Sequence, residues 1–135
     1  MGYEIIEHTA DVGIRARADA LNELFEQATL GLLDIAGAYR PDLSGDRLPI
    51  SVEAMDLGGL LVDWLSEVLY LQDARDLVVT DVGVDAVSER SASGHVDVVP
   101  RTESLEGTAV KAITYHAIEV VRTADGWIAQ VFVDI

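Results

Sequence analysis

Apolar and polar residues alternate with a period of two in several segments of the chain, which is the pattern of strands that bury one face. The first such segment covers residues 13–18, and we expect it to pair with a strand-like run over residues 3–7. Residues 47–54 repeat the alternation. Ala124-Asp125-Gly126 is the strongest hairpin signal. From residue 77 onward the pattern predicts strands alone, over 77–88, 94–99, 109–122 and 127–133.

Two other segments repeat their apolar residues three or four positions apart, the spacing of amphipathic helices. The first runs over residues 21–35, and we expect Asp19 to cap its start and Gly37 to lie near its end. The second covers residues 57–69, and Asp56 is its candidate cap. Both helices should therefore turn one apolar face toward a core.

Strands and helices interleave at first and then give way to a run of hairpins. This order predicts an α+β protein, with two amphipathic helices packed on a largely antiparallel β-sheet. Residues 1–135 are long enough for a single compact domain with a real core. Hydrophobic residues make up 50% and aromatic residues only 6%, so that core should consist mainly of Val, Leu, Ile and Ala.

Charge restricts the partners of the chain. Nine basic against 24 acidic residues give a net charge of −15, which would repel a phosphate backbone, so we expect no direct binding of nucleic acid. The acidic balance suits divalent cations or a basic surface on a protein partner. Acidic enrichment across a whole proteome would produce the same balance without any function.

Several classes of site are disfavoured by what the sequence lacks. The chain has no cysteine, which excludes disulfides and thiolate chemistry, and no glycine-rich phosphate loop. His8, His95 and His116 fall in separate strands or strand ends without the helical spacing of a zinc pair, which disfavours a zinc hydrolase. No apolar run approaches the length of a membrane span and no signal peptide is present, so we expect a cytoplasmic protein that does not enter membranes.

The end of the chain is the strongest candidate site. The strand-like run over residues 131–135 stops on Asp134 and Ile135, so a side-chain carboxylate and the free α-carboxylate lie one residue apart. Two hard anionic oxygen groups favour a divalent cation. Asp11 follows the first strand, and a neighbouring strand ending at Asp134 could bring the two carboxylates together. Alternatively, Asp134 is a solvated edge residue and Asp11 is a turn acid bonded to its own backbone.

Two further residues have open roles. His8 could orient a carboxylate, donate a hydrogen bond at a partner interface or fill a strand position. Lys111 is the only lysine of the chain. It could contact a partner or a nucleotide, or it could protect an edge strand from aggregation.

Four blocks of the sequence together resemble the archease family. They follow the family's order over nearly the whole chain, as His8-Thr9-Ala10-Asp11-Val12-Gly13, the helical segment 60–71 (LLVDWLSEVLYL), the strand 110–116 (VKAITYH) and the terminal 131–135 (VFVDI). The resemblance implies a small non-enzymatic accessory protein of an RtcB-type RNA ligase. Such a protein would promote the ligase's guanylylation and multiple turnover in tRNA splicing and RNA repair.

The resemblance also implies a divalent cation, Ca²⁺ or Mg²⁺/Mn²⁺, held by acidic residues. Carried over by position, its ligands would be Asp11 and Asp134, with Ile135 contributing through its backbone or α-carboxylate. His8 and Lys111 match motif positions and are candidates for a role beside the metal or at the partner surface. A monomer is expected. Two alternatives are a stand-alone metal-dependent phosphoester or nucleotide hydrolase and a chaperone-like acidic interaction module.

Overall fold

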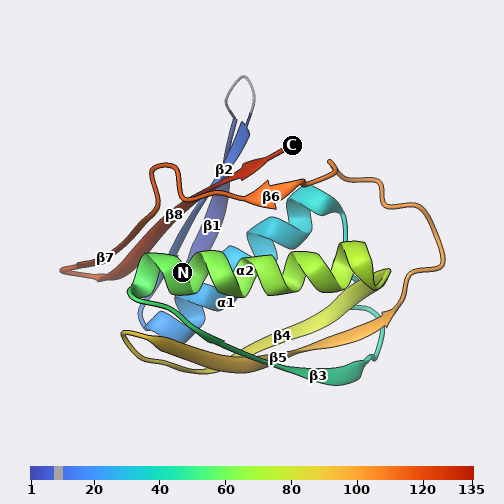
Figure 1. Ribbon diagram of the computed structural model, residues 1–135, viewed down its shortest axis with the longest axis horizontal. Helices are drawn as coiled ribbons and strands as arrows, with labels where there is room; N and C mark the ends of the chain where they lie inside the picture. The colour runs from blue at the N-terminus through green and yellow to red at the C-terminus, as the bar shows by residue number, and fades with distance from the viewer. Residues whose placement is uncertain (8–10) are drawn as a thin grey trace.

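Two antiparallel sheets enclose two helices in the computed structural model, which describes residues 1–7 and 11–135 (Figure 1). The N-terminal half contains the elements β1 (Gly2–Glu7), β2 (Asp11–Ala18), α1 (Leu21–Ala36), β3 (Asp46–Glu53) and α2 (Leu57–Ala74). The C-terminal half contains only strands: β4 (Leu77–Val87), β5 (Ser91–Pro100), β6 (Ala112–Ile113), β7 (Glu119–Thr123) and β8 (Gly126–Asp134).

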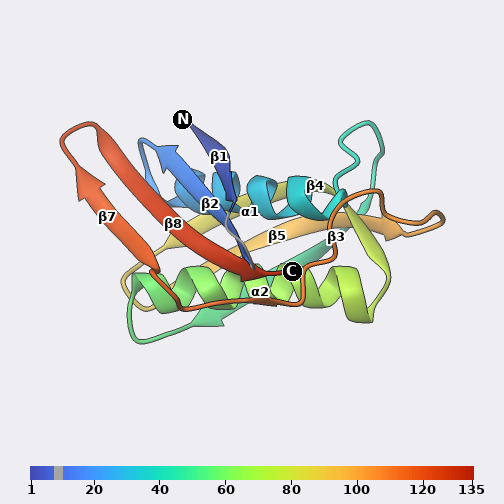
Figure 2. The same cartoon turned by 90° about the horizontal axis from the view of Figure 1, so that it is seen from above.

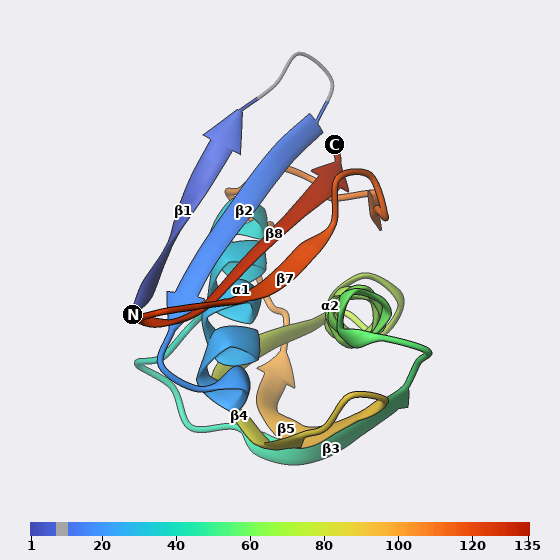
Figure 3. The same ribbon diagram turned by 90° about the vertical axis from the view of Figure 1, so that its left-hand side faces the viewer.

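The two sheets lie on opposite sides of a layer formed by α1 and α2 (Figure 3). The five-stranded sheet has the order β1-β2-β8-β6, and β7 also pairs with β8, ahead of β6 along that strand. The three-stranded sheet has the order β3-β5-β4. All strand pairs within the sheets are antiparallel among the described residues, and the helices lie side by side between them (Figure 2). The predicted α+β class with two helices is confirmed.

The core lies between the helices and the inner faces of the two sheets. Alternation in β2 places Val12, Ile14, Ala16 and Ala18 in this core, as the period-two pattern predicts. Trp64 of α2 is fully buried and donates its Nε1 hydrogen to Thr29 Oγ1 of α1 at 3.0 Å. This bond satisfies the one polar atom of the indole inside an aliphatic core.

The ends of the helices follow two of the three predicted signals. The Asp56 carboxylate accepts a hydrogen bond from the Gly59 main-chain N–H at 2.8 Å, so it caps α2 as predicted. Gly37 ends α1 in the left-handed conformation, with φ 66°. The prediction that Asp19 caps α1 is wrong, because Ala20 occupies the cap position and makes no side-chain bond. β2 continues to Ala18, which leaves Asp19 one residue too early.

The predicted strand over residues 109–122 is divided into β6 and β7, which corrects the sequence analysis. Both pair with β8, but the chain takes six residue steps from Ile113 to Glu119 while β8 takes three from Val133 to Gln130. The extra residues loop away from the sheet, and Ala117 turns the chain with φ 51°. The alternation of residue types continues through this turn, so the pattern alone does not reveal it.

Candidate metal centre

The pairing of β2 with β8 places Asp11 directly opposite Asp134. Their register runs without interruption from Asp11 and Asp134 to Ala18 and Trp127. Directly opposed residues of an antiparallel pair project from the same face, with Cβ atoms about 4.5–5.5 Å apart. Two acids that are 123 positions apart in the sequence are therefore neighbours in space.

Both acids lie on the outer face of the five-stranded sheet. Their neighbours Val12 and Val133 are buried, 7% and 0% exposed, so the alternation turns the two acids toward solvent. Asp11 is half-buried and Asp134 is exposed. Ile135 follows directly and is 37% exposed, at the end of β8 beside the start of β2 (Figures 1 and 3).

On the side of β8 away from β2, Asp134 is bonded to the segment that leads into β6. The Lys111 N–H donates a hydrogen bond to the Asp134 carbonyl at 2.8 Å, and Ala112 is the register partner of Asp134. An alanine beside the acid leaves room over that side of the sheet. The Lys111 side chain is exposed. His8, the other residue with an open role, lies outside the described residues.

An aromatic residue borders the two acids on the same outer face. Phe132, two residues before Asp134, lies opposite Gly13, where a Cβ atom would come within 2.8 Å of Phe132 Cε1. The missing side chain therefore lets the phenyl ring settle over β2. His116 packs against that ring from the loop after β6, with 6.0 Å between ring centroids and a tilt of 55°.

The loop that carries His116 is also bonded to α2. The Tyr115 hydroxyl donates to Asp63 Oδ1 at 3.5 Å. The negative charge of Asp63, and then burial, raise the pKa of Tyr115 above its usual value of 10.0, so the neutral donor form persists to high pH. The helical segment 60–71 and the segment 110–116, both named in the family resemblance, are thus joined by a side-chain hydrogen bond.

The donor chemistry of this face fits a hard divalent cation. Asp11 and Asp134 offer carboxylate oxygens from two paired strands, and the main chain of Ile135 adds oxygen next to them. Ca²⁺, Mg²⁺ and Mn²⁺ prefer such ligands. Both aspartates belong to one antiparallel ladder, so their side chains extend from directly opposed positions.

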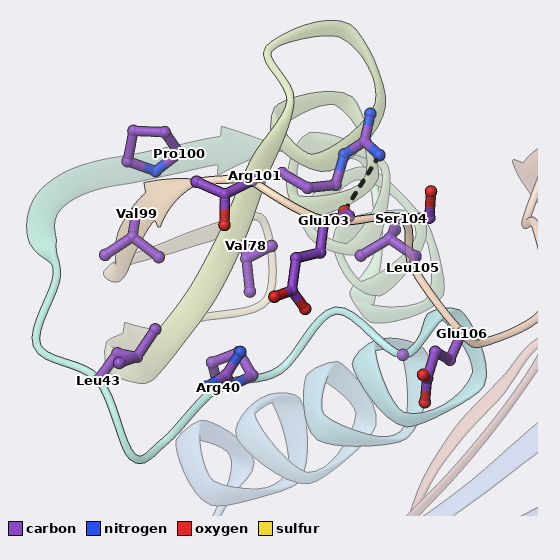
Figure 4. A pocket seen from close by; sticks show the side chains of 12 residues that line it. Arg40, Leu43, Val78, Val99, Pro100, Arg101, Glu103, Ser104, Leu105 and Glu106 are labelled. Carbon is purple, nitrogen blue, oxygen red and sulfur yellow. Dashed lines mark hydrogen bonds between the residues drawn. The ribbon is translucent and has the colours of Figure 1, made fainter.

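A pocket away from the two acids has no comparable chemistry. It measures about 310 Å³ and lies between the segment after α1 and the segment after β5 (Figure 4). Its two arginines are already neutralised, since Arg40 pairs with Asp42 at 2.8 Å and Arg101 pairs with Asp76 at 2.8 Å. No residue of the five-stranded sheet lines it, so it is separate from Asp11 and Asp134.

A second group of potential metal ligands was missed by the sequence analysis. Asp81, His95 and Asp97 of the three-stranded sheet place one donor atom each within 4.8 Å of one another. The spacing His95-x-Asp97 in an alternating strand is the signal that could have revealed two of them. The third depends on strand register, which the pattern does not give.

Comparison with known proteins agrees with this architecture. The model of the Archease protein family (MTH1598/TM1083) matches residues 3–135. The archease of Pyrococcus furiosus is 38% identical over 141 residues, with 98% of each chain covered. That of Methanosarcina barkeri is 36% identical over 140 residues, covering 98% of this chain and 95% of the relative.

Two solved structures share the fold. The solution structure of Methanobacterium thermoautotrophicum protein 1598 is 25% identical, with a TM-score of 0.78 and 99% of each chain covered. The crystal structure of an archease from Thermotoga maritima, described as a possible chaperone, is 20% identical, with a TM-score of 0.67 and 98% and 96% of the two chains covered. The family match over nearly the whole sequence, together with relatives of this similarity, shows that the chain belongs to the archease family.

Proposed function

We propose that this protein is a non-enzymatic accessory protein of an RtcB-type RNA ligase. It promotes guanylylation of the ligase and its multiple turnover, in tRNA splicing and RNA repair. The observation that carries this proposal is the register of β2 and β8, which sets Asp11 opposite Asp134 on an open face. The protein acts there through a shared divalent cation, Ca²⁺ or Mg²⁺/Mn²⁺, and not through a catalytic group of its own.

Five residues would contribute to this site. Asp11 and Asp134 would hold the ion, and Ile135 would add a main-chain oxygen. The ion would supply positive charge that stabilises phosphate oxygens during guanylylation. Lys111, fixed through its N–H to Asp134, keeps a cationic side chain close enough to meet an acidic group of the ligase or a nucleotide phosphate. His8, which precedes Asp11 by three residues, is a candidate for orienting a carboxylate.

The charge of the protein supports a protein partner. A net charge of −15 complements the basic surface that a ligase needs for RNA, and such complementarity accelerates encounter and selects the orientation of docking. The same charge keeps the accessory protein from competing for the RNA itself. Raising the salt concentration should therefore weaken its action on the ligase.

The test replaces each aspartate by its neutral isostere, in Asp11→Asn and Asp134→Asn. Asp125→Asn is the matched control, because Asp125 is an exposed acid in the turn at the far end of β8. With a purified RtcB-type ligase, guanylylation and ligation over many turnovers are measured with each variant. We expect both site variants to lose stimulation while the control retains it. Full stimulation by both site variants would refute the proposal.

The same proteins separate the alternatives. Hydrolysis of GTP or a generic phosphoester without ligase, lost in the site variants, would favour a hydrolase. Suppression of aggregation of unrelated basic clients would favour a chaperone-like module, the role suggested by the description of the Thermotoga maritima protein. Stimulation restricted to the ligase supports the accessory role.

A further inference from the structure

Three side chains that could ligate a metal lie together on the outer face of the three-stranded sheet. Asp81 comes from β4, and His95 and Asp97 come from the central strand β5. One donor atom of each lies within 4.8 Å of the other two. Asp81 is exposed, while His95 and Asp97 are half-buried. The group is therefore accessible to solvent but partly covered by neighbouring residues.

Strand geometry builds this group. Gly94, Val96 and Val98 of β5 are buried, so His95 and Asp97 project together from the outer face. A register shift between Val79 and Asp81 brings Asp81 opposite Asp97. The three donors therefore come from regular, hydrogen-bonded strands and not from a loop.

Gly83 leaves the space that the His95 imidazole occupies. It is the β4 register partner of His95, and a Cβ atom there would lie 2.4 Å from His95 Cε1 and 2.8 Å from His95 Nε2. Any side chain at position 83 would therefore displace the ring. With glycine at position 83, the His95 imidazole occupies the space beside β4, the strand that carries Asp81. One of its nitrogen atoms lies within 4.8 Å of an oxygen of each carboxylate.

Arg47 of β3 is the cation that Asp97 binds in this structure. Its Nε donates to Asp97 Oδ1 at 3.0 Å, and its Nη2 donates to Oδ2 at 3.5 Å. The hydrogen bond from Arg47 lowers the pKa of Asp97, which keeps the carboxylate charged. Arg47 thus keeps the Asp97 carboxylate anionic, but it also competes with a metal ion for the same two oxygens.

We propose that Asp81, His95 and Asp97 form a second cation site, selective for Zn²⁺ or a similar transition-metal ion over Ca²⁺. One imidazole and two carboxylates are a mixed nitrogen and oxygen donor set, which borderline metals prefer and hard Ca²⁺ does not. Ligand atoms around tetrahedral Zn²⁺ are about 3.4 Å apart at bond lengths near 2.1 Å. Rotation of the exposed Asp81 side chain can close the remaining gap, and solvent completes the coordination.

This site is independent of Asp11 and Asp134. The two groups lie on different sheets, separated by the layer of α1 and α2 (Figure 3). One protein would then carry a hard-cation site on one outer face and a borderline-metal site on the other. Loss of either can be measured without loss of the other.

The test uses untagged, chelator-treated full-length protein, with Zn²⁺ alone as the probe. Binding is measured by titration calorimetry in the Asp134→Asn background, which removes the other candidate site. Imidazole NMR signals report which histidine is engaged. The variants are His95→Ala and Asp81→Asn, and His116→Ala is the matched control on the other sheet.

We expect His95→Ala and Asp81→Asn each to weaken Zn²⁺ binding by about tenfold or more, since even an outer-shell change commonly costs that much. His116→Ala should leave it unchanged. Arg47→Gln should tighten binding, because it removes the competing cation from Asp97. Zn²⁺ should perturb the His95 signals, and Ca²⁺ should not. Equal affinity in the parent and His95→Ala proteins, with both folded by circular dichroism, would overturn the proposal.

Discussion

The hydrogen bond between Trp64 and Thr29 gives a sharp test of how the two helices are held together. Both residues are fully buried, and the Thr29 hydroxyl also donates to the Phe25 carbonyl at 2.6 Å. One hydroxyl therefore serves as acceptor for α2 and donor within α1. Water cannot replace it inside a closely packed core.

The perturbation is Thr29→Val, which keeps a branched side chain but removes the acceptor of the indole N–H. A buried donor left without a partner costs about 1–3 kcal/mol. Thr29→Ser retains the hydroxyl and removes one methyl group, which should lower the free energy of unfolding by about 1 kcal/mol. Valine should therefore be the more destabilising of the two, although it is the more hydrophobic residue.

The assay is urea unfolding followed by far-ultraviolet circular dichroism, with m-values compared to confirm an unchanged transition. Trp64→Phe removes the donor and creates its own packing defect. In that background, Thr29→Val should cost about 1 kcal/mol less than in the parent protein. An equal cost in both backgrounds would show that the hydrogen bond is not the reason for the destabilisation.

Two further predictions concern single elements. Asp56→Ala removes the cap of α2 and should lower the free energy of unfolding by about 1 kcal/mol in the same urea assay, whereas an unchanged midpoint would deny the cap a stabilising role. Burial, followed by the hydrogen bond to Asp34 at 3.0 Å, raises the pKa of the Tyr3 hydroxyl above 10.0. The stability that this shift contributes is fully present below pH 10 and is lost as pH rises through the folded-state pKa. In urea unfolding between pH 9 and 11, the free energy of unfolding should therefore fall less with rising pH in Tyr3→Phe than in the parent protein. An equal fall in both proteins would contradict this assignment.

Residue patterns predicted the elements that obey one-faced alternation. β2 and β8 each turn one side to the core, and their aliphatic residues report this directly. The strand ends also suggested that Asp11 and Asp134 could lie together, and the family resemblance implied that the two acids share a cation. The structure places them as register partners. Whether they bind a cation stays a prediction.

Other features depended on information that neighbouring residues do not carry. Asp19 and Ala20 both precede α1, and Asp19 is the better capping residue. Ala20 nevertheless occupies the cap position, because β2 extends to Ala18. The group of Asp81, His95 and Asp97 requires both an alternating strand and a register shift in its partner. Long-range pairing decides these outcomes.

The position of β8 has a consequence for synthesis of the protein. β8 follows every other element in the chain, yet it lies inside the five-stranded sheet and pairs with β2, β6 and β7. Until β8 leaves the ribosome, these three strands expose unpaired backbone edges, and the helices lack part of their cover. The five-stranded sheet can therefore form completely only after β8 has been translated.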